Sequence, residues 1–455
     1  MAWTADFIAA VEERNLGLHS LMVLQSGELI TSRWWTPYSP EKIHQLYSLS
    51  KSFTSTAAGL AVAEGRFALT DTVISFFPDD LPEVVSDNLA AMTVHDLLCM
   101  ATGHVAEPWR EGDNWVQNFL LGPVEKQPGT HFLYNSLATY MVAAIVTKTT
   151  GQSLLEYLRP RLLDPLGVAD ATWETCPKGI QVGGWGLCVT TDTIARFGEL
   201  YRCDGVWKGK RLLPEGWVER ATTSHISNGD PNSSSDWTQG YGYQFWRCRH
   251  GAYRGDGAFG QYCIVMPAQE LVIAITSGTD NMQAVLDALW ETAPITSPSP
   301  NAPPAPSNGG AREECLDSRG EVPHPVGELT SPHAVNRIFT FGENEQGVTA
   351  MSLTFDADGA TLARTDRFGT HTFQIGLGRW REGETTYHPA RSAGPQPTAI
   401  WGAWTAPNVL SFRLCYTEHP STPLYTLTFE GEKLIVERTG AMGLGTPASV
   451  RLESE

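Results

Sequence analysis

The sequence lacks several features that would place it in particular functional classes. Lys and Arg total 32 against 50 Asp and Glu, which gives a formal net charge of -18. A chain without a basic excess is poorly suited to bind the phosphate backbone of nucleic acids or an anionic membrane surface. Its most apolar stretches, such as residues 140–146, are far shorter than the ~20 residues that a membrane span requires. We therefore expect neither a nucleic-acid partner nor a membrane partner.

A secretory signal and a disulfide framework are also missing. The first residues, MAWTADFIAAVEERN, contain no basic segment, and Asp6 and Glu12 interrupt the apolar pattern. The eight cysteines include no CxxC pair, and several lie in apolar runs, as Cys263 does in QYCIVM. Reduced, buried thiols are typical of cytosolic proteins. The sequence therefore predicts a cytoplasmic protein.

Several well-known catalytic motifs are absent as well. There is no GxSxG, which argues against an α/β-hydrolase nucleophile elbow. There is no HExxH, the twelve histidines are dispersed, and no Gly-rich loop has Walker or dinucleotide-binding spacing. We expect neither a metal ion nor another cofactor.

Composition divides the chain into three parts. Residues 1–292 mix helical and strand-like patterns, with helices in the middle and strands at both ends, which predicts an α/β (α+β) domain with one sheet. Residues 293–332 begin with the uncharged, Pro-rich stretch PITSPSPNAPPAPSNGG and are predicted to be a linker. Residues 333–455 alternate between apolar and polar positions, as in VLSFRLCY, and predict a small antiparallel β domain, a barrel or half-barrel.

The most informative segment is LYSLSKSFTSTAAGLAVAEG, in which Ser48 and Lys51 open an apolar helix. Residues three apart share a helix face, so the Ser48 hydroxyl and the Lys51 amine can meet. Burial and the helix N-terminus both disfavour a protonated lysine, and a neutral lysine can accept the serine proton. For an isolated SxxK, an N-cap serine beside a solvated lysine would be the better explanation. Here the small residues that follow favour close packing and a catalytic role.

This segment resembles the nucleophile helix of the serine β-lactamase and penicillin-binding-protein superfamily, in particular class C β-lactamases, esterases and D-aminopeptidases. Further segments match in the same order: TVHDLLCMATG at 93–103, PGT at 128–130 before Tyr134, and GGWGL at 183–187. The resemblance covers roughly residues 15–290. It implies an antiparallel sheet flanked by helices together with a helical subdomain.

The resemblance also implies roles at the second motif of the family, Tyr-x-Asn. Tyr134 is retained and would relay a proton or act as a base together with Lys51. Ser136 stands where the family has Asn, and would hydrogen-bond Lys51 or a substrate carbonyl.

The third motif departs from the family. Where a Lys or His is usual, the alignment places Asp256, while Arg254 would supply a cation in a shifted register. An aspartate would repel the carboxylate of a penicillin-type substrate and attract an amine. Gly257 allows close approach of the backbone, and an N–H near Phe259 would complete an oxyanion hole with that of Ser48.

Together these features predict a serine hydrolase that cleaves an ester or amide of a small-molecule or peptide-like substrate through an acyl-enzyme on Ser48. Trp109, Trp115 and Trp185 are candidates to line an acyl pocket, although packing explains each equally well. Alternatives within the fold are an acyltransferase or peptide cyclase and a β-lactamase. An alternative of another class is a catalytically silent ligand-binding homologue. The sequence leaves a homodimer open.

Overall fold

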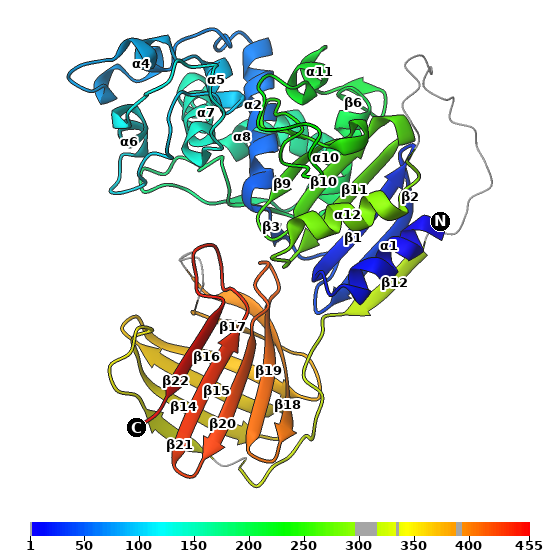
Figure 1. The fold of residues 1–455 in the computed structure, drawn as a ribbon, viewed down its shortest axis with the longest axis vertical. Helices are drawn as coiled ribbons and strands as arrows, with labels where there is room; N and C mark the ends of the chain where they lie inside the picture. Colours follow the sequence, from blue (N-terminus) through cyan, green and yellow to red (C-terminus); the bar gives the residue numbers. More distant parts are fainter. Residues whose placement is uncertain (1, 296–315, 334–335, 388–393) are drawn as a thin grey trace. The chain divides into compact units, whose positions relative to one another are not determined.

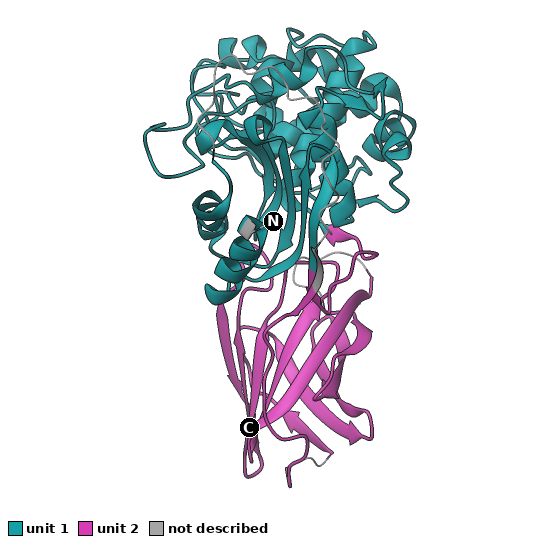
Figure 2. Cartoon of the chain, turned by 90° about the vertical axis from the view of Figure 1, so that its right-hand side faces the viewer, with its two compact units in different colours: residues 1–33, 45–318 teal, residues 34–44, 319–455 magenta. Residues whose placement is uncertain are grey.

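The computed structural model describes residues 2–295, 316–333, 336–387 and 394–455. Contacts divide the chain into two compact units (Figure 2). Unit 1 contains residues 1–33 and 45–318, and unit 2 contains residues 34–44 and 319–455.

The central sheet of unit 1 is antiparallel and joins the two ends of its sequence. Strand β11 (LVIAITS) lies in the middle and is buried along its whole length, which explains its continuous apolar pattern. It pairs with β1 on one side and β10 on the other. In spatial order the strands are β12 (Leu316–Glu321), β2 (Glu28–Thr36), β1 (Leu18–Gln25), β11 (Leu271–Ser277), β10 (Gln261–Met266), β9 (Tyr253–Gly257) and β8 (Trp246–Arg247).

Helices pack on this sheet and form a separate helical region (Figure 1). The helices α1 (Ala2–Glu13) and α12 (Met282–Thr292) pack against each other, and α10 (Thr191–Arg202) packs on β1, β10 and β11. Gly198 lets α10 approach closely, because a Cβ there would lie 2.5 Å from Val272 Cγ1. The other helices are α3 (Val73–Phe76), α4 (Asp87–Ala91), α5 (Val94–Leu98), α6 (Trp115–Leu121), α7 (Ser136–Thr150), α8 (Leu154–Leu158), α9 (Asp164–Leu166) and α11 (Trp217–Thr222).

The helix α2 (Ser50–Ala63) is the core element of unit 1. Residues 50–61 are all buried, and several of its polar side chains have buried partners, although Ser55 Oγ has none among the described residues. Ser52 Oγ donates to the Gln244 carbonyl at 2.9 Å, and Thr56 Oγ1 lies 2.8 Å from the Tyr201 hydroxyl. Small side chains are needed here, since a Cβ at Gly59 would lie 2.3 Å from the Trp217 ring.

Unit 2 is a curled sheet that forms a half-barrel, and within the described residues its strand pairs are antiparallel, as the alternating sequence predicts, with one exception. The prediction is wrong for β16 and β18, which pair in parallel because β17 lies between them in sequence. Along β15 every second residue is buried, and the buried side chains form one core with Phe373, Phe412 and Leu427. Its strands are β13 (Arg337–Thr340), β14 (Val348–Asp356), β15 (Gly359–Asp366), β16 (Gly369–Leu377), β17 (Arg381–Thr385), β18 (Gln396–Ala406), β19 (Val409–Tyr416), β20 (Leu424–Glu430), β21 (Lys433–Thr439) and β22 (Ser449–Glu453).

The structure divides the chain differently from the predicted boundaries at 292 and 333. Part of the predicted linker, 316–321, forms the edge strand β12, and residues 319–332 belong to unit 2. Residues 34–44 also belong to unit 2, although they lie far away in sequence. Both departures from the predicted boundaries arise because segments far apart in the sequence pair in space. The composition of the chain does not reveal such pairing. The Pro-rich part, 296–315, lies outside the described residues.

Two further expectations concern membranes and thiols. In the described part of the chain, none of the helices combines the length and apolar character needed to span a membrane. The cysteines that the structure describes are all free thiols, as predicted, and Cys263 is buried. Cys315 lies outside the described residues.

Candidate active site

The candidate nucleophile lies on a short 3₁₀ turn, η1 (Tyr47–Leu49), directly before α2. Tyr47 adopts a left-handed backbone conformation with φ of 47°, which is uncommon for a residue with a side chain. Leu49 and Ser50 continue into helical geometry. Ser48 and Lys51 therefore share one side of the turn, as the SxxK spacing predicts.

Lys51 is 1% exposed, and its amine donates to three oxygen acceptors. Nζ lies 3.0 Å from Ser48 Oγ, 3.2 Å from Ser136 Oγ and 2.7 Å from the Gly184 carbonyl. Burial lowers the pKa of Lys51 to about 7, and the carboxylates of Glu107 and Asp256 oppose this shift. At neutral pH a large fraction of this amine is thus uncharged and able to accept a proton.

Tyr134 is the third member of this group. Its phenol hydrogen-bonds the Ser48 side chain, and Lys51 Nζ lies 4.8 Å from the centre of its ring. Burial raises the pKa of Tyr134 well above its ordinary value. A raised pKa favours the protonated phenol at neutral pH. Trp246 stacks on Tyr134, with ring centres 5.2 Å apart.

The second motif is placed by the start of α7. Asn135 caps this helix, because its side-chain oxygen accepts the N–H groups of Leu137 and Ala138. The capped turn places Ser136 beside Lys51, where the sequence alignment predicts it. Gly184 must be glycine, since a Cβ there would lie 2.8 Å from the Ser136 carbonyl oxygen.

The third motif lies on β9. Arg254 is fully buried and Asp256 is 6% exposed. The guanidinium donates from Nε to Asp256 Oδ2 at 2.9 Å, and its second nitrogen lies 2.8 Å from the same oxygen. Burial raises the pKa of Asp256, and the Arg254 charge opposes this shift. The charge of Asp256 is therefore neutralised inside the protein by Arg254, the residue considered as a cation at the third motif in a shifted register.

The turn after β9 lies against the nucleophile turn. A Cβ at Gly257 would lie 2.0 Å from the Leu46 carbonyl oxygen. Phe259 has a positive φ of 64°, and its ring meets that of Tyr47 edge to face, with centres 5.4 Å apart. These contacts place the turn after β9 against the nucleophile turn, and the oxyanion hole of the Ser48 and Phe259 N–H groups stays a prediction.

The three tryptophans considered as candidates to line an acyl pocket differ in their surroundings. Trp115 and Trp185 have ring centres 5.9 Å apart, and Arg110 lies 5.0 Å above the Trp185 ring. Trp185 Nε1 donates to Glu174 at 3.0 Å. Trp109 is 76% exposed.

Sequence reasoning did not identify three groups at this site: Glu107, the Gly184 carbonyl and Trp246. Glu107 Oε1 accepts the Ser136 N–H at 3.0 Å. A carbonyl has no sequence signature, and the other two reach the site through tertiary packing. The paired glycines at 183–184 were the one available signal for a close backbone approach.

One cluster outside this site has metal-ligand chemistry. Ligand atoms of His95, Asp96 and Cys99 lie within 4.8 Å of one another. They are engaged elsewhere: Asp96 accepts the backbone N–H and hydroxyl of Thr93, and His95 Nδ1 lies 2.7 Å from the Tyr243 hydroxyl. A helix cap and a packed aromatic group explain these residues.

Comparison with known proteins adds independent findings. A family model described as Beta-lactamase matches residues 6–293. The 6-aminohexanoate-dimer hydrolase of Paenarthrobacter ureafaciens is 27% identical over 278 residues, 56% of this chain and 71% of that protein. Esterase EstB of Burkholderia gladioli is 25% identical over 195 residues, 36% of this chain and 49% of the esterase, so the chain spans about half of that relative.

A solved structure extends the likeness beyond unit 1. The octameric penicillin-binding protein homologue from Pyrococcus abyssi matches with a TM-score of 0.51 and 15% identity, covering 99% of both chains. At this identity the match shows a common fold, and it includes the β domain.

Proposed function

The chain belongs to the Beta-lactamase family, and on this basis we propose that it is a serine hydrolase that cleaves an ester or amide bond through an acyl-enzyme on Ser48. One observation carries the proposal: an almost fully buried Lys51 amine lies 3.0 Å from Ser48 Oγ. The names of two relatives, an amide hydrolase and an esterase, agree with this reaction class.

In the proposed reaction the neutral Lys51 amine takes the Ser48 proton as Oγ bonds to the substrate carbonyl carbon. The carbonyl oxygen becomes an oxyanion, which accepts hydrogen bonds from the N–H groups of Ser48 and Phe259. The carbon–oxygen or carbon–nitrogen bond then breaks. The leaving group departs with the proton that Lys51 and Tyr134 deliver. Water, deprotonated by Lys51, attacks the carbonyl carbon of the acyl-enzyme. The bond from that carbon to Ser48 Oγ then breaks, Oγ takes the proton back from Lys51, and the acid leaves.

The third motif narrows the substrate class. In β-lactamases the resemblance implies a cation at this place for a substrate carboxylate. Here the Arg254 guanidinium is bound to Asp256 at 2.9 Å and is fully buried. A pair that neutralises itself offers no free charge to a carboxylate. We therefore propose neutral or amine-bearing esters and amides as substrates, rather than penicillins.

The proposal is tested with a fluorophosphonate probe and intact mass, followed by turnover of p-nitrophenyl esters, D- and L-amino-acid anilides and nitrocefin. We expect one covalent adduct on the wild type and none on Ser48→Ala. Ser75→Ala, whose hydroxyl only donates to the Thr72 carbonyl, is the matched control and should label like the wild type. A wild type that neither labels nor turns over any substrate would favour the silent ligand-binding homologue.

A further inference from the structure

The buried ion pair on β9 connects to the reactive groups through one side chain. Asp256 accepts a hydrogen bond from Arg254, and the Arg254 guanidinium lies 5.7 Å from the centre of the Trp246 ring. Burial raises the pKa of Asp256, and the Trp246 indole N–H, which acts on the same carboxylate, opposes this rise. Trp246 and Arg254 are directly opposite each other on β8 and β9, which keeps these three side chains together. The Trp246 ring stacks on Tyr134 at 25° between planes. The phenol of Tyr134 in turn hydrogen-bonds Ser48.

The Arg254 guanidinium is also held by groups other than Asp256. Its NH1 donates to the Asp236 carbonyl at 2.8 Å and to Cys248 Sγ at 3.1 Å. The guanidinium also lies 4.5 Å from the centre of the Trp237 ring. Nε and NH1 are therefore hydrogen-bonded within the protein, while NH2 lies 2.8 Å from Asp256 Oδ2 without hydrogen-bond geometry.

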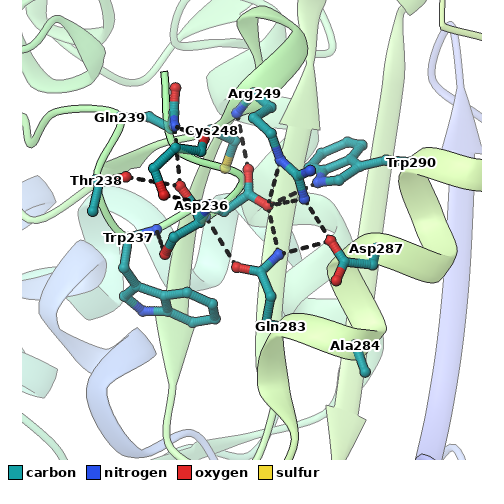
Figure 3. A network of polar contacts seen from close by, with 12 residues as sticks. Asp236, Trp237, Thr238, Gln239, Cys248, Arg249, Gln283, Ala284, Asp287 and Trp290 are labelled. Carbon is teal, nitrogen blue, oxygen red and sulfur yellow. Dashed lines mark hydrogen bonds and ion pairs between the residues drawn. The ribbon is translucent and has the colours of Figure 1, made fainter. Parts of the chain in front are cut away.

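Asp236 is itself held by a dense polar network (Figure 3). Its side chain is fully buried and accepts from the Arg249 backbone and guanidinium, from Gln283 Nε2 at 2.9 Å and from Trp290 Nε1 at 2.9 Å. Arg249 also donates to Asp287 at 2.6 Å. Two of these partners and Asp287 lie on α12, so the network ties the loop that carries Asp236 to this helix.

A buried ion pair is a poor way to gain stability, since apolar side chains of similar volume often stabilise a core as well or better. What such a pair supplies is fixed geometry, because neither partner can move without leaving an unpaired charge. A continuous series of side-chain contacts connects α12 with Tyr134, through Asp236, Arg254, Asp256 and Trp246.

We propose that the Arg254–Asp256 ion pair, anchored by Asp236, positions Tyr134 for proton transfer at Ser48 by fixing the Trp246 indole against the phenol. The proposal rests on the serine hydrolase function proposed above. Arg254, Asp256 and Trp246 act through Tyr134 and are positioning residues.

Two variants test this role. Trp246→Phe keeps an aromatic ring on Tyr134 but removes the N–H that acts on Asp256. Arg254→Lys keeps the buried charge but loses the planar guanidinium contacts with Asp256 and Asp236. With a p-nitrophenyl ester we expect kcat to fall about 10-fold in each, with KM within about twofold, because the reacting groups are misplaced while substrate contacts remain.

The matched control is Arg364→Lys. Arg364 and Asp366 form another buried Arg-x-Asp pair, on β15 of unit 2. This control should lose stability, measured by thermal unfolding, and keep its kcat. Trp246→Phe leaves every buried charge paired. It therefore still tests the positioning role if Arg254→Lys does not fold.

The outcomes separate the two proposals. A wild type that does not react with fluorophosphonate or ester overturns the hydrolase function, and the positioning role with it. An active wild type with folded Trp246→Phe and Arg254→Lys variants of unchanged kcat overturns the positioning role alone. Variants that lose stability as Arg364→Lys does, but keep kcat, would mean that the pair only stabilises the fold.

Discussion

Two Arg-x-Asp pairs, Arg254–Asp256 on β9 and Arg364–Asp366 on β15, share the same local pattern. In a strand, residues two apart point to the same side, so each arginine lies beside its aspartate. All four side chains are at most 9% exposed. The closest contacts differ: 2.8 Å in unit 1 and 3.5 Å in unit 2.

The partners beyond each pair differ more than the pairs themselves. The Trp246 indole N–H acts on Asp256, and its ring stacks on Tyr134 next to the candidate nucleophile. Asp366 instead accepts the Phe368 N–H at 2.9 Å in a turn and lies 3.3 Å from His371 Nε2. The same sequence pattern thus lies next to the candidate active site in one unit and next to a turn in the other. Its function is decided by tertiary neighbours.

The largest effect that we predict follows from the tight backbone contact beside the first pair. In Gly257→Ala the new Cβ would lie 2.0 Å from the Leu46 carbonyl oxygen, so β9 and the nucleophile turn must separate. We expect kcat/KM with a p-nitrophenyl ester to fall about 100-fold, since a displacement of about 1 Å is sufficient for this.

Gly359→Ala is the corresponding change on β15, the strand that carries the second pair. Its Cβ would lie 2.1 Å from the Ile375 carbonyl oxygen, and its φ is 139°. This variant should lose roughly 1–3 kcal/mol of stability to backbone strain and keep kcat/KM. Equal losses of activity in the two alanine variants would show that the contact at Gly257 has no special link to the site.

The sequence was sufficient for those parts of the site that depend on local spacing. Ser48 and Lys51 meet because they are one helical turn apart, so a short stretch of sequence contains the physical cause. Ser136 is 85 residues away from Lys51 in sequence, and its place beside the amine was implied by the family resemblance rather than by local spacing. The same resemblance correctly predicted the fold of unit 1, and alternation correctly predicted the β character of unit 2.

The features of the fold and of the site that the sequence did not predict depend on contacts between distant segments. Both Arg254 and Asp256 were considered as free charges at the third motif, whereas the structure pairs them. Their pairing follows from strand geometry, but burial on both sides of β9 and the indole of Trp246 come from packing. The assignment of residues 34–44 to unit 2 has the same origin, because only pairing in space reveals it.

The second prediction concerns stability. Asp366→Asn removes the carboxylate that Arg364 contacts at 3.5 Å and leaves a buried guanidinium without its ion-pair partner. We expect unfolding in urea to lose roughly 3 kcal/mol, the low end of the cost of breaking a buried pair. Activity at 25 °C should stay at the wild-type level. A large loss of kcat in this variant would contradict the contrast between the two pairs.

The third prediction uses the charge around Lys51. If neutral Lys51 is the base, kcat/KM rises with pH through about 7, the pKa of that amine. Glu107 raises this pKa, so Glu107→Gln should lower it and move the rise to lower pH. The shift should be roughly half a pH unit, because water screens an exposed carboxylate. A glutamine keeps an oxygen for the Ser136 N–H.

Asp366→Asn is the charge-matched control for this pH profile. It removes one carboxylate from unit 2 and should leave the rise near its wild-type position. A shift to higher pH in Glu107→Gln would exclude a proton-accepting Lys51, since removing a negative charge cannot favour the protonated amine.

The smallest effect is expected at an exposed ion pair of unit 2. This pair tests whether burial decides how much the Arg-x-Asp pairs contribute to the free energy of unfolding. Arg451 NH1 lies 2.7 Å from Glu437 Oε1, closer than the Arg364–Asp366 contact, but the side chains are 58% and 45% exposed. Glu437→Gln should change the free energy of unfolding by less than about 0.5 kcal/mol, because solvent screens the pair. The change should vanish in about 1 M salt, where the screening length is about 3 Å. If this variant instead lost as much stability as Asp366→Asn, distance rather than burial would decide the strength of these pairs, and the buried position of Arg254 would no longer distinguish it.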